Sequence, residues 1–289
     1  MSNISQIIPE RTADIGSFLV GRILPFRKKR MVGPFIFIDH MGPAEIKPGN
    51  YADIGQHPHI GLSTLTYLFE GEILHKDSIG TEQLITPGSV NIMTAGNGVV
   101  HTERTPAYLR DGRTSRMHGF QIWVALPKEF ENMEPEFEHV SKDKLPKWEI
   151  DSLSFTLIAG EAFGRKAPLK VFSPLFMLEV VASEASILDL KNEIKGEVGI
   201  CVVNGAVSSN GNVVEKGNML VSKTEDTCCI EVQENTHLLI FGGKPFEEER
   251  FIAWNFVSSS KETLEKAKAD WQANGFKLIA GEGAKIEMF

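Results

Sequence analysis

The 289-residue chain has few cysteines and no long apolar run, which argues against a disulfide-rich secreted protein and against a membrane-spanning one. Its three cysteines are Cys201, Cys228 and Cys229, an odd number with two adjacent, which is a poor disulfide framework and indicates a reducing compartment. No stretch approaches the roughly 20 apolar residues that a membrane-spanning helix needs. The first residues also lack the basic and apolar regions of a secretory signal. We therefore expect a cytoplasmic protein without a membrane partner.

An excess of positive charge is also lacking. The formal net charge is −8, and an acidic chain repels polyphosphate, which disfavours direct nucleic-acid binding. The sequence contains no DNA-binding motif, so a regulatory role would have to act through a protein partner.

Turn residues, by contrast, are plentiful, with 26 glycines and 14 prolines separating short apolar or alternating runs. Many short strands at such spacing are typical of a sandwich or barrel. Strands are predicted at Phe35–Ile38, Thr64–Phe69, Leu84–Ile85, Val90–Met93, Val99–Thr102, Phe120–Leu126, Phe155–Ala159, Met177–Ala182, Ile187–Leu190, Val198–Val203, Val213–Val214, Met219–Val221, Ile230–Val232 and Leu238–Phe241.

The two halves of the chain share a layout. Glu70-Gly71 and Pro87-Gly88 in the first half resemble Asn204-Gly205 and Lys216-Gly217 in the second, and each pair of turns brackets two strands. We therefore predict an all-β protein of two stacked antiparallel β-barrels of the jelly-roll type.

One helix is predicted near the C-terminus, in SSSKETLEKAKADWQANG. Ser259 with Glu262 fits a capping box at its start, and Gly275 fits the stop after its last turn.

Two strand segments of the first half carry closely spaced candidate metal ligands. QHPHIG places His57 and His59 two residues apart, and VVHTE places His101 and Glu103 two residues apart. Side chains at i and i+2 of a strand point to one face, so two such strands can offer three imidazoles and a carboxylate to one ion. A lone histidine on a strand is more often structural, but the four residues arrive in an order that one barrel can use.

Four ligands leave up to two positions of an octahedron open, which distinguishes reactive sites from closed structural ones. No cysteine lies in this half, which excludes a thiolate zinc site. The donor set suits Fe, Mn, Ni, Cu, Co or Zn.

The motifs GQHPHIG, TYLFEGEILHKDSIG, PGSVNIMTAGNGVVHTE and MHGFQIWVALP resemble those of the pirin family of the cupin superfamily, over roughly residues 15 to 250. The resemblance implies a bicupin whose N-terminal barrel binds one divalent metal, Fe(II) first, through the residues matching His57, His59, His101 and Glu103. Bacterial and human pirins are associated with dioxygenase cleavage of the flavonol quercetin, and the human form with iron-dependent transcriptional co-regulation.

The chain departs from the family pattern at two places. Many members read HPHRGFET where this chain reads HPHIGLST, so Ser63 replaces a glutamate. The segment FIAWNFVSSS also differs from the GPFVMNT pattern of many pirins, which leaves the subfamily and its substrate open.

The second half lacks matching ligands. The offsets of the four candidate ligands from their turns, applied to Gly205 and Gly217, give Lys191, Glu193, Ile230 and Val232, which cannot replace three imidazoles. We therefore divide the chain into a metal-binding barrel at residues 1–140 and a metal-free barrel with the C-terminal helix at residues 141–289.

Two classes of function fit these features. In an enzyme, the metal would bind a flavonol-like substrate in its reaction with dioxygen, and Glu103 would act as the catalytic base that accepts the hydroxyl proton. In a regulatory protein, the metal would sense iron or redox state and change a surface used by a protein partner. His40, His75 and His118 are either hydrogen-bonded partners of the ligands or structural residues, and the structural role is the more common one.

Overall fold

The computed structural model describes residues 4–209, 211–222 and 229–288, and the described part is built of β-strands with a single α-helix. Each strand predicted from the sequence has a counterpart, with ends that differ by up to eight residues, which confirms the all-β prediction. Cys228 lies outside the described residues. In the described part of the chain no helix is long and apolar enough to cross a membrane.

The chain folds into two compact units, and each is assembled from separate stretches of sequence. One unit, here called the histidine-rich unit, comprises Thr12–Val20, Asp39–Lys142 and Glu247–Phe289. The other, the aliphatic unit, comprises Met1–Arg11, Gly21–Ile38 and Asp143–Phe246. The boundary at 142/143 lies beside the predicted one at 140/141. A single boundary does not describe the two ends of the chain, however, because Met1–Arg11 is grouped with the second half and Glu247–Phe289 with the first.

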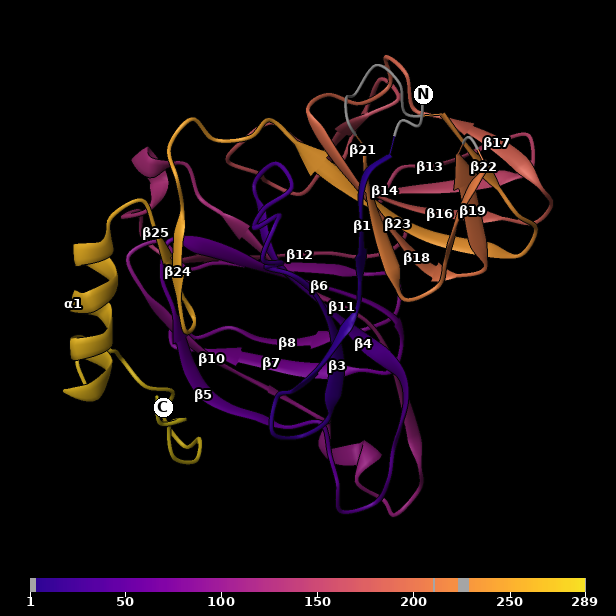
Figure 1. The fold of residues 1–289 in the computed structure, drawn as a ribbon. Helices are drawn as coiled ribbons and strands as arrows, with labels where there is room; N and C mark the ends of the chain where they lie inside the picture. The colour runs from indigo at the N-terminus through magenta and orange to yellow at the C-terminus, as the bar shows by residue number, and fades with distance from the viewer. Residues whose placement is uncertain (1–3, 210, 223–228, 289) are drawn as a thin grey trace. The chain divides into compact units, whose positions relative to one another are not determined.

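Two sheets make up the body of the histidine-rich unit (Figure 1). The smaller has the order β5 (Ile54–His59), β10 (Val99–Arg104), β7 (Ile73–Asp77), β8 (Glu82–Ile85). The larger has the order β12 (Glu136–Val140), β9 (Val90–Thr94), β6 (Leu62–Glu70), β11 (Ser115–Ala125), β4 (Phe35–Ile46), β3 (Leu19–Leu24), β2 (Arg11–Asp14). Short 3₁₀ helices follow β10 and β11, at Ala107–Leu109 and Lys128–Phe130.

The aliphatic unit has the same two-sheet plan. Its larger sheet runs β1 (Ile4–Pro9), β21 (Asn218–Ser222), β18 (Glu197–Asn204), β23 (Thr236–Gly243), β16 (Leu175–Ala182), β14 (Leu153–Ala162), β13 (Lys147–Ile150), with β15 (Arg165–Lys166) paired to β14. Its smaller sheet runs β17 (Ser186–Asp189), β22 (Cys229–Val232), β19 (Ala206–Ser209), β20 (Asn212–Glu215). Two open sheets per unit, rather than closed barrels, are compatible with the predicted jelly-roll type.

Aliphatic side chains fill the interior between the sheets of this second unit. Ile230 and Val232, which the offset comparison places where His101 and Glu103 stand in the first half, are buried in that core with Leu188 and Val207. Lys191 and Glu193 are exposed. The donor atoms that a metal needs are thus replaced there by apolar packing, although the absence of a metal from this unit stays a prediction.

The C-terminal segment packs on the histidine-rich unit. The hairpin of β24 (Phe251–Ala253) and β25 (Phe256–Ser258) leads into α1 (Lys261–Gln272) (Figure 1). Leu264, Ala267 and Trp271 form the buried face of α1, in one cluster with Ile60 and Val100. This differs from the prediction that groups the helix with the second barrel, because its apolar face finds its partners on strands of the first.

The helix begins one residue later than the capping-box prediction. Ser260 is the N-cap, and its Oγ accepts from the backbone N–H of Thr263. Ser259 is unavailable because its N–H and Oγ–H both donate to the carboxylate of Glu131. At the other end Asn274, at φ 58°, takes the left-handed position predicted for Gly275.

Candidate metal centre

Strands β5 and β10 bring the three predicted histidine ligands together. The two strands pair antiparallel with His101 opposite His57 and Val99 opposite His59, so the i, i+2 spacing puts the three rings on one face. Their ligand nitrogens all lie within 4.8 Å of one another, and the Nε2 atoms of His59 and His101 are 3.1 Å apart. All three side chains are buried.

Burial keeps these imidazoles neutral. Desolvation lowers the pKa of His57 to about 4, and the nearby His75 lowers it further. A hydrogen bond to the Gly55 carbonyl acts in the opposite direction and raises it. Desolvation, together with the neighbouring imidazoles, also holds the pKa of His59 and of His101 well below the ordinary value. A neutral imidazole is the form that binds a metal, so the protonation state of this cluster suits a transition metal.

Hydrogen bonds at Nδ1 orient two of the rings. His57 donates from Nδ1 to the carbonyl of Gly55 at 2.8 Å, and His59 donates from Nδ1 to the carbonyl of Asn255 at 3.0 Å. A carbonyl can only accept, so the proton of each ring sits on Nδ1 and the lone pair on Nε2. Asn255 belongs to the FIAWNFVSSS segment, so the part of the chain that departs from the family pattern contributes a contact to a metal-ligand candidate.

Glu103, the fourth predicted ligand, lies nearby but is not a member of the close group. It is buried on β10, its side chain is hydrogen-bonded to Thr66, and burial raises its pKa against the lowering effects of His75 and Thr66. The pairing of β10 with β5 is irregular between His101 and Glu103, where three residues of β5 span two of β10. The assignment of Glu103 as a ligand and catalytic base therefore stays a prediction.

His75 and Asp77 extend the cluster along β7. The Nδ1 of His75 lies 3.4 Å from the Nδ1 of His101, and its Nε2 lies 3.0 Å from Oδ2 of Asp77. Phe137 of β12 stacks on the His75 ring, with centroids 4.8 Å apart. The sequence signal for this pair is the His-Lys-Asp spacing in TYLFEGEILHKDSIG, which puts both side chains on one strand face.

The larger sheet faces the histidines with a mixture of polar and aromatic groups. The Trp123 and His59 rings pack in a T-shaped arrangement, with their centroids 5.0 Å apart. Thr66 donates to Oε1 of Gln121 at 2.8 Å as well as contacting Glu103. These contacts show that the centre lies between the two sheets of the histidine-rich unit.

The remaining candidate positions lie elsewhere in this unit. His40 and His118 form a separate pair with Nε2 atoms 3.0 Å apart, and His40 stacks on Phe120. Ser63, which replaces the common family glutamate, is buried, and its Oγ lies 2.9 Å from Oγ1 of Thr94. Strand alternation puts Ser63 and Thr66 on opposite faces of β6, and Thr66 is on the face toward the histidines. The replacement of glutamate by Ser63 therefore does not change the side chains that face the histidines.

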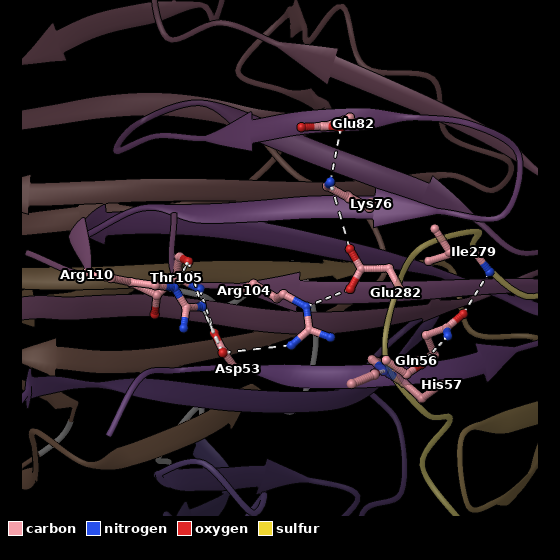
Figure 2. A network of polar contacts seen from close by, with 12 residues as sticks. Asp53, Gln56, His57, Lys76, Glu82, Arg104, Thr105, Arg110, Ile279 and Glu282 are labelled. Carbon is pink, nitrogen blue, oxygen red and sulfur yellow. Dashed lines mark hydrogen bonds and ion pairs between the residues drawn. The ribbon is translucent and has the colours of Figure 1, made fainter. Parts of the chain in front are cut away.

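The chain after α1 crosses the outer side of the strands that carry the ligands (Figure 2). Gln56, next to His57, accepts from the N–H of Ile279 and donates to the carbonyl of Gly283. Glu282 accepts from Nε of Arg104 at 2.8 Å. Sequence reasoning did not find these contacts, because they join residues more than 170 positions apart.

Three comparisons with known proteins agree with this geometry. Residues 18–124 match the Pirin family, and residues 177–277 match the Pirin C-terminal cupin domain. A pirin-like protein of Caulobacter vibrioides is 46% identical over 278 residues, covering 95% of both chains. A Pseudomonas aeruginosa protein, whose name assigns it a proposed quercetin 2,3-dioxygenase activity, is 37% identical over 98% of this chain and 90% of its own.

Solved structures show the same relationship. The crystal structure of a quercetin 2,3-dioxygenase from Acinetobacter baumannii superimposes with a TM-score of 0.90 at 38% identity, covering 98% of this chain and 94% of its own. A second structure of that name from the same organism has a TM-score of 0.86 at 25% identity and covers 96% of this chain and 98% of its own. Since full-length relatives, two domain matches and the fold all agree, the chain belongs to the pirin family.

Proposed function

We propose that this protein is a metal-dependent dioxygenase that cleaves quercetin or a related flavonol. The observation that carries the proposal is the convergence of three buried, neutral imidazoles on one point between two sheets. The names of the relatives and of the superimposed crystal structures support the choice of reaction.

His57, His59 and His101 would hold one divalent transition metal through Nε2, and Glu103 would be the fourth ligand or would take the substrate proton. We propose Fe(II) because of the pirin resemblance, while Mn, Ni, Cu, Co and Zn suit the same donors. When bound, such a metal supplies Lewis-acid chemistry toward a chelating enol-type oxygen and redox chemistry toward dioxygen.

Glu103 is suited to proton transfer. Its pKa is raised by burial, so its carboxylate is a stronger base than an exposed glutamate. The side chain of Thr66 on the facing sheet is hydrogen-bonded to that of Glu103. A flavonol carries a hydroxyl beside a carbonyl, and Glu103 would accept the proton of that hydroxyl as its oxygen approaches the histidines.

The surroundings of the histidines suit a flat aromatic substrate. The Trp123 ring beside His59 offers an apolar surface, and Gln121 with Thr66 supplies the few polar groups that orient a bound ligand. Localisation in the cytoplasm, inferred from the cysteine pattern, is part of the same proposal.

Metal analysis and oxygen uptake test the function. Protein purified without affinity tag or chelator is expected to carry about one transition metal per chain, and the His57→Ala/His101→Ala variant is expected to lose it. His237→Ala is the matched control, because His237 pairs with Glu179 in the aliphatic unit at 2.9 Å. Full metal occupancy in the double variant would refute the site.

Oxygen consumption with quercetin is then measured for protein loaded separately with iron, manganese, nickel, copper or cobalt. At least one form should consume oxygen, and the double variant should not. If no form consumes oxygen while the loaded protein binds flavonols tightly, the enzyme proposal fails. The regulatory alternative, an iron or redox sensor acting through a protein partner, would then replace it.

A further inference from the structure

The three histidines differ in what holds the proton at Nδ1. His57 and His59 each donate to a backbone carbonyl, which cannot donate in return. The partner of His101 at Nδ1 is the ring of His75, at 3.4 Å, and at Nε2 it is the ring of His59, at 3.1 Å; a neutral imidazole nitrogen can be either donor or acceptor. The tautomer of His101 is therefore not fixed by its neighbour alone.

The group that settles the role of His75 is Asp77. Oδ2 of Asp77 lies 3.0 Å from Nε2 of His75, and the side chains of the two residues are 0% and 4% exposed. Because a carboxylate only accepts, the Nε2 atom of His75 carries a proton, and in the neutral imidazole the Nδ1 atom then carries the lone pair that faces His101. The stacked Phe137 ring holds the imidazole in this plane.

The orientation of the Asp77 carboxylate is itself fixed. Its Oδ1 accepts from the backbone N–H of Ile79 at 3.1 Å and of Thr81 at 2.9 Å, which leaves Oδ2 for His75. The arrangement is a chain of hydrogen bonds from His101 through His75 to Asp77, in which each donor faces an acceptor.

We propose that Asp77, acting through His75, sets the tautomer of His101 so that its Nε2 is free to bind the metal. Asp77 and His75 are positioning residues in this proposal, which rests on the metal site of the proposed function. Outer partners of this kind typically change metal affinity by about 10–100-fold.

Asp77→Asn inverts the chain of hydrogen bonds without removing the side chain. The two backbone N–H donors hold Oδ1 in place, so the new amide NH₂ group takes the position of Oδ2 and donates to Nε2 of His75. His75 must then carry its proton on Nδ1, where it faces Nδ1 of His101. His101 is driven to accept at Nδ1 and to carry its proton on Nε2, the atom that should bind the metal.

Nitrogen-15 NMR of the metal-free protein reads the tautomer directly, because protonated and unprotonated ring nitrogens of neutral histidine have well separated shifts. We expect the Nδ1–H tautomer of His101 in the unmodified protein and the Nε2–H tautomer in Asp77→Asn. The same tautomer of His101 in both proteins, or Nε2–H in the unmodified protein, would overturn the proposal.

Cobalt(II) binding gives the second readout, followed by its visible absorption. Asp77→Asn should weaken cobalt affinity by about 10–100-fold. Glu179→Gln is the matched control, since it alters an imidazole–carboxylate pair in the aliphatic unit, and its cobalt affinity should be unchanged. Thermal unfolding of the metal-free variants checks that both fold.

His75→Asn separates the hydrogen-bond chain from a local structural effect. The Asn Oδ1 can take the place of His75 Nδ1 and accept from His101, while the connection to Asp77 is cut. In that background Asp77→Asn should cause no further loss of cobalt affinity. An equal loss in both backgrounds, or a loss below about 3-fold in the single variant, would refute the role of Asp77. If the unmodified protein fails to bind cobalt, the metal site of the proposed function fails, while the NMR result still decides the tautomer.

Discussion

The buried ion pair of Arg250 and Glu131 should determine whether the C-terminal segment stays packed against the strands of the histidine-rich unit. The two side chains are 1% and 8% exposed, and Nε of Arg250 lies 3.1 Å from Oε1 of Glu131. The same carboxylate accepts from Ser258 and from the N–H and Oγ–H of Ser259, immediately before α1. Glu131→Ala therefore removes the nearer of two carboxylates from a buried guanidinium, leaving Glu248 at 3.7 Å, and also removes acceptors from the helix entry.

Breaking a buried ion pair from one side costs about 3–5 kcal/mol. At about 2–4 °C per kcal/mol, the unfolding temperature of this unit should fall by roughly 6–20 °C. Calorimetry measures the transition, and hydrogen exchange over residues 251–272 should show faster exchange in the hairpin and helix. Glu161→Ala is the control, because the Glu161–Lys166 pair is 67% and 77% exposed and should contribute little to stability. If Glu131→Ala shifts the transition no more than Glu161→Ala does, the ion pair does not hold the segment.

Two further predictions concern the metal centre. Glu103→Gln keeps the shape of the side chain but removes the base, so turnover of quercetin should fall by about 10²–10⁴-fold. Flavonol affinity, measured by fluorescence titration, should change little. Equal losses of turnover and affinity would contradict a proton-transfer role. Because burial lowers the pKa of His57 to about 4, its neutral, metal-binding form persists as the pH falls through 6.5. Zinc affinity measured by competition titration should therefore change little between pH 8 and pH 6, whereas a steep loss through pH 6.5 would show ordinary, solvated histidines.

The histidine ligands could be predicted because their geometry is local. Two His-X-ligand segments on extended chain place their side chains on one face, and the observed pairing of His101 with His57 needs only antiparallel strands in register. The strands themselves follow from short apolar runs between turn residues. The apolar runs do not predict β5, because Ile54–His59 carries one apolar aliphatic residue in six and no alternation, so its extended conformation rests on the His-X-His spacing alone.

Features that depend on distant contacts could not be predicted. The i, i+2 rule puts Glu103 beside His101, but the irregular pairing near Gly55 depends on how two whole strands align. The apolar face of α1 predicts that the helix is buried without saying against which sheet, and its partners, Ile60 and Val100, lie about 160 to 210 residues earlier. The carbonyl of Asn255 that orients His59 carries no sequence signal, since every residue has a carbonyl.

These distant contacts explain why the centre can be both buried and polar. A buried polar group is costly unless it is hydrogen-bonded, and the protein provides acceptors for the Nδ1 protons of His57 and His59. In the proposed arrangement Asp77, through His75, gives His101 the same tautomer, and the lone pairs of His59 and His101 then face each other across 3.1 Å. Two facing lone pairs repel unless a cation lies between them. The hydrogen bonds at Nδ1 thus leave the Nε2 lone pairs without a donor and direct them toward one point. A transition metal bound by neutral nitrogen ligands would accept these lone pairs.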